Sequence, residues 1–187
     1  MDRPEIAPPA GYPHLKYAQI ERERRWLCTQ MPEEAISAPE IFEIVDYYLP
    51  DSALRLRSAA PLHGGVDNLR LSKKTQLADP RHRLITTIYL SESEYAQMRV
   101  LGGLVLKKHR HSFSLAGRRI SVDRFDAPLA GLVLAEVEFD DDETMSAYPS
   151  PPFAIREVTH DAHFTGFALA QLAAAGAPDL AALTGDR

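Results

Sequence analysis

Two pairs of glutamates, far apart in the chain, limit what this sequence can fold into. Glu21 and Glu23 stand two residues apart in IERERRWL, and Glu136 and Glu138 do so in LAEVEF. Both stretches have the composition of β-strands, in which alternate side chains point to the same face. Carboxylates that face a protein interior are strongly destabilising unless cations meet them. The sequence therefore predicts that other strands carry inward-facing cations.

Such cations occur in the same alternating format, in the stretches Arg55-Leu56-Arg57, Lys73-Lys74 and Lys108-His109-Arg110. Rows of acid opposite rows of base suggest a barrel with a charged, water-filled interior. That interior suits a polyanion held through a divalent metal ion. We therefore expect an α+β fold, an antiparallel eight-stranded closed β-barrel (a tunnel) with a charged interior and several flanking helices.

The composition narrows the class of protein. A chain of 187 residues predicts one domain, and 45% hydrophobic residues suffice for a sizeable core. The net charge of −5 argues against general nucleic-acid binding. The single cysteine, Cys28, cannot form an internal disulfide, which fits a reducing compartment. No apolar run approaches a membrane span, and the first residues lack a signal peptide. We expect a cytoplasmic protein with no nucleic-acid or membrane partner.

Turn and cap signals divide the chain. Residues 1–14 contain four prolines and a glycine and are expected to be a flexible lead-in, followed by the barrel domain at 15–172 and a frayed tail at 173–187. Strands are expected at 15–28, 44–48, 53–60, 66–74, 84–90, 104–113, 118–125 and 132–139. Helices are expected at 38–43 after a Ser37 cap, from Ser91 to 101 with Glu94 in a capping box, at 140–147, and from a Thr159 cap to 174.

These motifs, in this order, resemble the CYTH superfamily, also called the triphosphate tunnel metalloenzymes. That superfamily includes bacterial tripolyphosphatases, thiamine triphosphatases and a class of adenylate cyclases. Its hallmark Glu-x-Glu-x-Lys stands here as Glu21-Arg22-Glu23-Arg24-Arg25. The further matches are Arg55-Leu56-Arg57, Arg70-Leu71-Ser72-Lys73-Lys74, Lys107-Lys108-His109-Arg110, Ser121-Val122-Asp123, Glu136-Val137-Glu138 and Arg156 to Asp161. The resemblance covers roughly residues 15–172.

The resemblance implies a metal-dependent hydrolase of a triphosphate, with inorganic tripolyphosphate as the leading substrate. It implies catalytic roles for Glu21, Glu23, Glu136 and Glu138, and substrate binding by Arg25, Arg55, Arg57, Lys74, Lys108 and Arg110. Lys74 is preferred to Lys73 because it shares a strand face with Ser72. The same four glutamates with Asp123 form a set of hard oxygen ligands, which suits Mg²⁺ or Mn²⁺. Dimers occur in the family, so a homodimer is an open expectation.

Two departures from the family pattern keep other functions open. Arg25 replaces the hallmark lysine, which keeps the charge but cannot act as a base. Ile85 and Thr87 stand where many active members carry a further pair of acids. The alternatives are a polyphosphate- or nucleotide-binding module with little turnover, or an adenylate cyclase or thiamine triphosphatase.

Other chemistry-bearing residues are given lesser roles. Tyr48 corresponds to a tyrosine near the active site of some members, although a core or rim role suits it equally. The histidine pairs His109/His111 and His160/His163 lack a third zinc ligand at motif spacing. We expect solvated or phosphate-facing roles for them, with His163 near the tunnel mouth.

Overall fold

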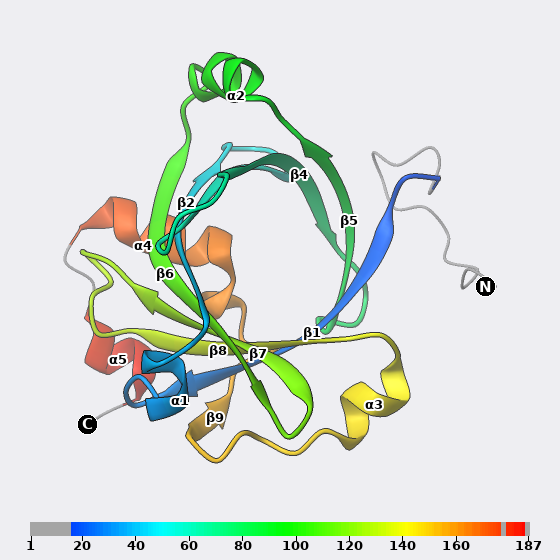
Figure 1. Ribbon diagram of the computed structural model, residues 1–187, viewed down its shortest axis with the longest axis vertical. Helices are drawn as coiled ribbons and strands as arrows, with labels where there is room; N and C mark the ends of the chain where they lie inside the picture. The colour runs from blue at the N-terminus through cyan, green and yellow to red at the C-terminus, as the bar shows by residue number, and fades with distance from the viewer. Residues whose placement is uncertain (1–15, 177–178, 186–187) are drawn as a thin grey trace.

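Eight antiparallel strands close into a barrel, and a ninth strand extends one edge of it (Figure 1). The computed structural model describes residues 16–176 and 179–185 of the chain. The strands are β1 (Gln19–Cys28), β2 (Glu40–Tyr48), β3 (Leu54–Pro61), β4 (Asn68–Gln76), β5 (His82–Tyr89), β6 (Leu104–Leu115), β7 (Arg118–Phe125), β8 (Val133–Phe139) and β9 (Ala154–Glu157). Their order is β5-β4-β3-β2-β6-β7-β8-β1-β9, and pairing of β5 with β1 closes the barrel. The expected α+β barrel of eight antiparallel strands is confirmed.

Strand β1 shares one of its edges between two partners. Gln19 to Arg22 pair with β5, whereas Trp26 to Cys28 pair with β9. The opposite edge pairs with β8 from Arg22 to Cys28. Because β5 pairs with only the first half of β1, the chain that follows β9 can fold back over the end of the barrel where β1 ends. There the amide of Val158 donates to the carbonyl of Arg25 at 2.8 Å.

Five α-helices and one 3-10 helix lie around the barrel in the described part of the chain (Figure 1). They are α1 (Glu33–Ile36), α2 (Glu92–Arg99), α3 (Asp142–Ala147), η1 (Ala162–Phe164), α4 (Gly166–Ala175) and α5 (Leu180–Thr184). The expected capping box of α2 is present, because Ser91 accepts from the amide of Glu94 and the Glu94 carboxylate accepts from the amide of Ser91.

Two helix predictions are wrong. The helix expected at 38–43 does not form there. The short helix α1 ends before Ser37, and it is followed by β2, which pairs with β6 along its whole length. Tertiary pairing outweighs the local helix signal there. The helix expected from a Thr159 cap to 174 is α4, which begins at Gly166 and is capped by Thr165, whose hydroxyl accepts from the amide of Ala168. Thr159 instead accepts from the amide of Arg25 at 2.9 Å.

The barrel has one apolar cluster outside its wall and another inside one end. The outer cluster joins Trp26, Ile120 and Val137 to Met145 of α3. The inner cluster contains inward-facing residues near the ends of four strands (Leu27, Leu106, Phe125 and Leu134), which pack with Phe164 and Leu169. Leu180 and Leu183 of α5, a helix that the sequence did not predict, pack against the same cluster. This apolar floor closes one end of the barrel and leaves the rest of the interior for charged side chains.

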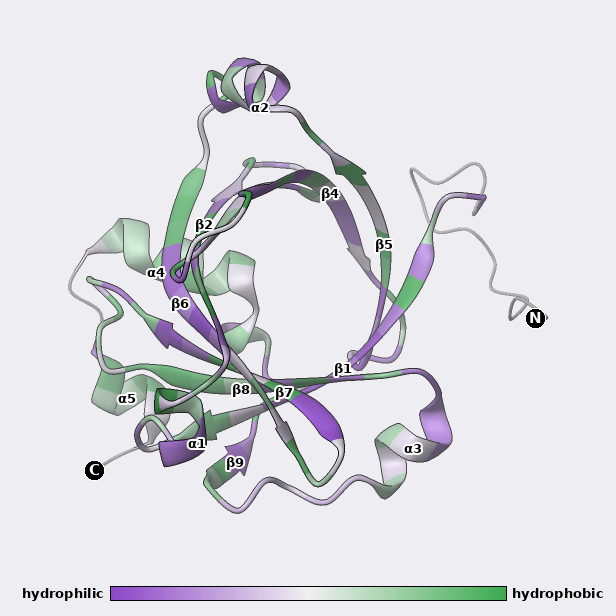
Figure 2. Ribbon diagram, in the orientation of Figure 1, coloured by the Kyte–Doolittle hydropathy of each residue, from purple (hydrophilic) through white to green (hydrophobic). Residues whose placement is uncertain are grey.

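The hydropathy of the strands follows this division. Strands β1 and β6 change between hydrophilic and hydrophobic residues along their length, whereas α4 is mostly apolar (Figure 2). The lead-in expected at residues 1–14 lies outside the described residues. Among the residues that are described, no helix is long and apolar enough to cross a membrane.

Candidate functional site

The barrel encloses a cavity of about 930 Å³ whose wall is largely charged. All the residues predicted to bind substrate line it, as do all four predicted catalytic glutamates. They are Glu21, Glu23, Arg25, Arg55, Arg57, Lys74, Lys108, Arg110, Glu136 and Glu138. Asp123 does not line the cavity, although its neighbours Lys108 and Arg110 do. The barrel therefore brings together charges that are distant in the sequence.

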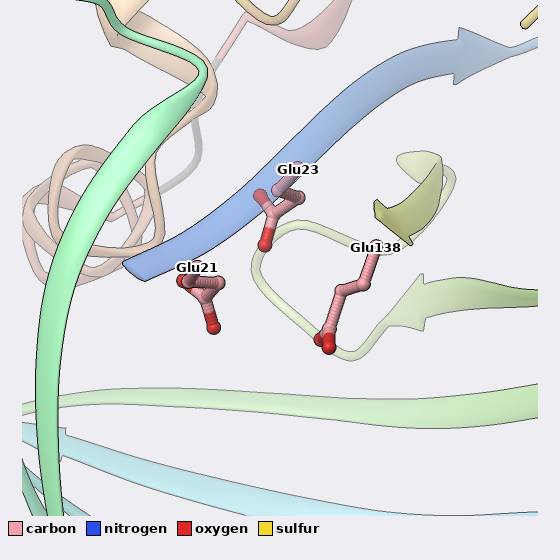
Figure 3. Close-up of side chains that lie close together, drawn as sticks. All are labelled: Glu21, Glu23 and Glu138. Atoms are coloured by element: carbon pink, nitrogen blue, oxygen red, sulfur yellow. The ribbon is translucent and has the colours of Figure 1, made fainter. Parts of the chain in front are cut away.

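Three carboxylates gather at one place in this cavity. Oxygen atoms of Glu21 and Glu23, from β1, and of Glu138, from β8, all lie within 4.8 Å of one another. Figure 3 shows the three side chains extending toward a common space. Burial, and then the charges of Glu21 and Glu23, raise the pKa of Glu138. A divalent cation would relieve this repulsion, so the residues present fit a Mg²⁺ or Mn²⁺ ion.

Cations already hold two of these three acids. Glu21 accepts a hydrogen bond from Lys74 Nζ at 2.6 Å, which places Lys74 in the cavity as predicted from its strand face. Glu23 forms ion pairs with Arg25 and, at 3.3 Å, with Arg83. Within the described residues, Glu138 has no ion-pair partner at this distance.

The other two predicted metal ligands, Glu136 and Asp123, are paired with cations. Glu136 accepts from Arg25 Nε at 3.1 Å and also pairs with Arg110. Burial opposes its ionisation, but Arg110, Lys108 and Arg25 together hold the pKa of Glu136 well below its usual range. Asp123 is fully buried and accepts hydrogen bonds from Lys108 Nζ and from Nε and Nη2 of Arg110. The structure thus gathers three of the five predicted ligands, and the other two orient cations.

A second group of charges, formed by β2, β3 and β4, includes two residues that the sequence analysis did not assign to the site. Asp46 is fully buried and accepts from Arg57 Nε at 2.6 Å and Nη2 at 2.7 Å, with Arg55 Nε 3.6 Å away. Arg70 lines the cavity beside them. Strand alternation could have identified both, because Asp46 shares a face with Tyr48, and Arg70 shares one with Ser72 and Lys74.

The two positions that lack acids also face the cavity. Ile85 and Thr87 both line it, and the Thr87 hydroxyl lies 3.1 Å from that of Ser72. Tyr48 lines it as well, next to Gly166, where an added Cβ would lie 2.0 Å from the tyrosine hydroxyl oxygen. Burial, and then the charge of Asp46, raise the pKa of Tyr48 to about 12.

The histidines lie away from this cavity. His109 and His111 face outward from β6, where they approach Asp126 at 3.3 Å and the Ala35 carbonyl at 2.8 Å respectively. His163 is exposed, pairs with Asp161, and borders a separate surface hollow. His163 does not itself line the cavity, whose wall takes Thr165 to Phe167 from this region, and its place near the tunnel mouth stays a prediction.

Comparison with known proteins gives a match in structure alone. No family model matches the sequence, and no curated protein matches it. Two solved structures match over 80% of this chain at 24% identity and a TM-score of 0.54: one described as the inorganic triphosphatase NE1496 (93% of that chain) and one as the hypothetical protein NE1496 (97%). The PH1819 protein from Pyrococcus horikoshii OT3 matches more weakly, with a TM-score of 0.47 and 19% identity over 67% of this chain and 82% of that one. The chain therefore shares its barrel fold with the two NE1496 structures.

Proposed function

We propose that this protein is a metal-dependent triphosphatase, with inorganic tripolyphosphate as its leading substrate. The observation that carries the proposal is that one closed barrel holds both a cluster of three carboxylates and a wall of arginines and lysines. A triphosphate has many anionic oxygens, which arginine binds as a fork and lysine as a point charge. The similarity of fold to a protein described as an inorganic triphosphatase supports the same class of substrate.

The cations of the cavity are held in place before substrate arrives. Asp46 fixes Arg57, and Asp123 fixes Lys108 and Arg110. Arg25 is fixed by Glu23, by Glu136 and by the carbonyl of Phe164, to which its Nη1 donates at 2.7 Å. Such fixed charges stabilise a phosphoryl-transfer transition state without reorganising, and this is the main catalytic contribution that we assign to these residues.

The carboxylate cluster supplies the metal site. Glu21, Glu23 and Glu138 would hold one Mg²⁺ or Mn²⁺ ion, because hard oxygen donors at this close spacing favour such ions. When bound, the ion would screen the phosphate charge and polarise a phosphoryl oxygen. Lys74, hydrogen-bonded to Glu21, lies where it can contact phosphate and cluster together.

A second candidate is a polyphosphate- or nucleotide-binding module with little turnover. The presence of Ile85 and Thr87 on the cavity wall favours it, since neither side chain can hold a metal ion as a carboxylate does. The two candidates share the anion site and differ in turnover.

Phosphate release separates these functions. Tripolyphosphate, ATP and thiamine triphosphate are each incubated with the protein in Mg²⁺, in Mn²⁺ and in EDTA. We expect metal-dependent release from tripolyphosphate, strongly reduced in Glu138→Gln and unchanged in Glu143→Gln, which removes an exposed acid of α3. No release, with tripolyphosphate still raising the melting temperature, would identify a binding module. Neither release nor a thermal shift would refute the proposed anion site.

A further inference from the structure

In the part of the chain that the structure describes, one cation of the cavity differs from the others because it has no ion-pair partner. Lys74, Lys108 and Arg110 each bind a carboxylate within the barrel. Arg70 lines the same cavity, yet it makes no ion pair within the described residues. Its side chain is therefore available to a ligand.

Unsatisfied hydrogen-bond donors mark the same place. Among the described residues, three buried side-chain polar atoms have no hydrogen-bond partner, and two of them are Nε of Arg55 and Nε of Arg70. Arg55 itself is only 7% exposed. A buried guanidinium donor without an acceptor is costly and rare in native proteins, which suggests that a ligand supplies the acceptor.

The local charge balance supports this reading. Arg57 pairs across strands with Arg70, so Arg55, Arg57 and Arg70 lie on adjacent positions of β3 and β4. Asp46 is the one carboxylate in contact with this group within the described residues; it binds Arg57 at 2.6 Å and lies farther from Arg55, at 3.6 Å. Burial, and then the charges of Arg57 and Arg55, lower the pKa of Arg70 to about 10. The group therefore carries uncompensated positive charge.

The place of Arg70 along β4 separates it from the carboxylate cluster. Lys74, which contacts Glu21, and Arg70 both face the cavity from β4. Because a strand rises about 3.3 Å per residue, the backbones of Arg70 and Lys74, four residues apart, are about 13 Å apart. An anion that contacts both ends of this row must be extended.

We propose that Arg70 and Arg55 form a subsite that binds one end of an extended oligophosphate, and so select tripolyphosphate over pyrophosphate. The proposal rests on the proposed function and adds to it a determinant of chain length. The far end of the anion reaches Lys74 and the carboxylate cluster, while the arginine subsite neutralises the charge at the other end, where Tyr89 lies opposite Arg70.

The test measures anion binding without metal. Titration calorimetry in EDTA gives the Kd of tripolyphosphate and of pyrophosphate for the wild-type protein, Arg70→Gln and Arg70→Lys. Arg124→Gln is the matched control, because this exposed arginine of β7 carries the same charge outside the barrel. We expect Arg70→Gln to weaken tripolyphosphate binding about 10- to 100-fold, pyrophosphate much less, and Arg70→Lys to restore part of the loss.

The melting temperature of the unliganded variants separates binding from a structural role. Removal of an unpaired cation that its neighbours repel should leave the melting temperature of Arg70→Gln unchanged or raise it. If wild-type protein binds tripolyphosphate and Arg70→Gln binds it as tightly, the subsite is refuted while the proposed function stands. Equal weakening in Arg124→Gln would also refute it, since overall charge would then be responsible. If the wild-type protein binds no tripolyphosphate in EDTA, the subsite is refuted, and the phosphate-release assay with Mg²⁺ or Mn²⁺ decides the proposed function separately.

Discussion

Asp46 offers the sharpest test of how this barrel tolerates charge in its interior. The substitution Asp46→Asn keeps the shape of the side chain but removes the carboxylate that accepts two hydrogen bonds from Arg57 and lies 3.6 Å from Arg55. Since Asp46 is fully buried, the guanidinium groups would remain in the interior without compensation. Breaking a buried ion pair in this way costs about 3 to 5 kcal/mol. At about 2 to 4 °C per kcal/mol for a chain of this size, we expect the melting temperature to fall by about 6 to 20 °C.

Urea unfolding and differential scanning calorimetry measure this loss against two controls. Asp142→Asn removes an exposed acid that pairs with Arg22, and we expect it to cost at most about 1 kcal/mol. The double variant Asp46→Leu with Arg57→Met removes both partners and should cost less than Asp46→Asn alone. Tripolyphosphate should raise the melting temperature of Asp46→Asn more than that of the wild-type protein, because the anion replaces the lost charge.

The pH dependence gives an independent check. Burial alone would raise the pKa of Asp46, but Arg57 and Arg55 lower it below the value in the unfolded chain. The stabilisation is therefore complete above about pH 4 and is lost as the pH falls through the lowered pKa. Asp46→Asn should lose less stability than the wild-type protein over that acid range. A variant that unfolds at the wild-type urea concentration at pH 7 would refute the assignment of Asp46 as the essential counter-charge.

Three further changes test other parts of the cavity. Because the pKa of Glu138 is raised in the folded state, its ionisation destabilises the protein as the pH rises above the unfolded value. Glu138→Gln should therefore unfold at a higher urea concentration than the wild-type protein at pH 7 without metal, and Mg²⁺ should stabilise it less. A lower stability of the metal-free variant would contradict the clustering of acids. Ile85→Glu with Thr87→Glu should weaken metal-free tripolyphosphate binding in calorimetry, whereas a gain in phosphate release would identify the parent as a binding module. Gly166→Ala should lower the melting temperature by about 2 to 12 °C, because the added Cβ would lie 2.0 Å from the Tyr48 hydroxyl oxygen. An unchanged melting temperature would show that Tyr48 moves aside readily.

Strand alternation accounts for most of what the sequence predicted correctly. The period of two assigned Glu21 and Glu23 to the interior and Arg24 to the exterior, and it favoured Lys74 over Lys73 for the cavity. Alternation alone does not describe the contacts of the outer face, where Arg24 binds Glu157 through two hydrogen bonds at 2.9 and 2.6 Å. That pair links β1 to β9, a strand with too few residues to give a clear pattern.

The ion pairs are harder to predict, because they depend on strand register and not on alternation alone. Alternation places Asp123 on the inner face, and a metal role followed from its acidity. The register sets Asp123 beside Arg110, so its oxygens are taken by cations before a metal ion could use them. Glu138 lines the cavity and has no ion-pair partner within the described residues, and this leaves it free to complete the carboxylate cluster.

The same reasoning explains why Asp46 and Arg70 were missed. Alternation places each on the inner face of its strand, but the role of each charge depends on its neighbours on adjacent strands, which alternation does not give. Arg57 sits between them in the register, next to Asp46 on β2 and to Arg70 on β4. One carboxylate therefore faces a row of arginines and neutralises the nearest, so the uncompensated charge falls on Arg70. The capacity of this wall to bind an anion arises from that imbalance, which is a property of the closed barrel and of no single sequence motif.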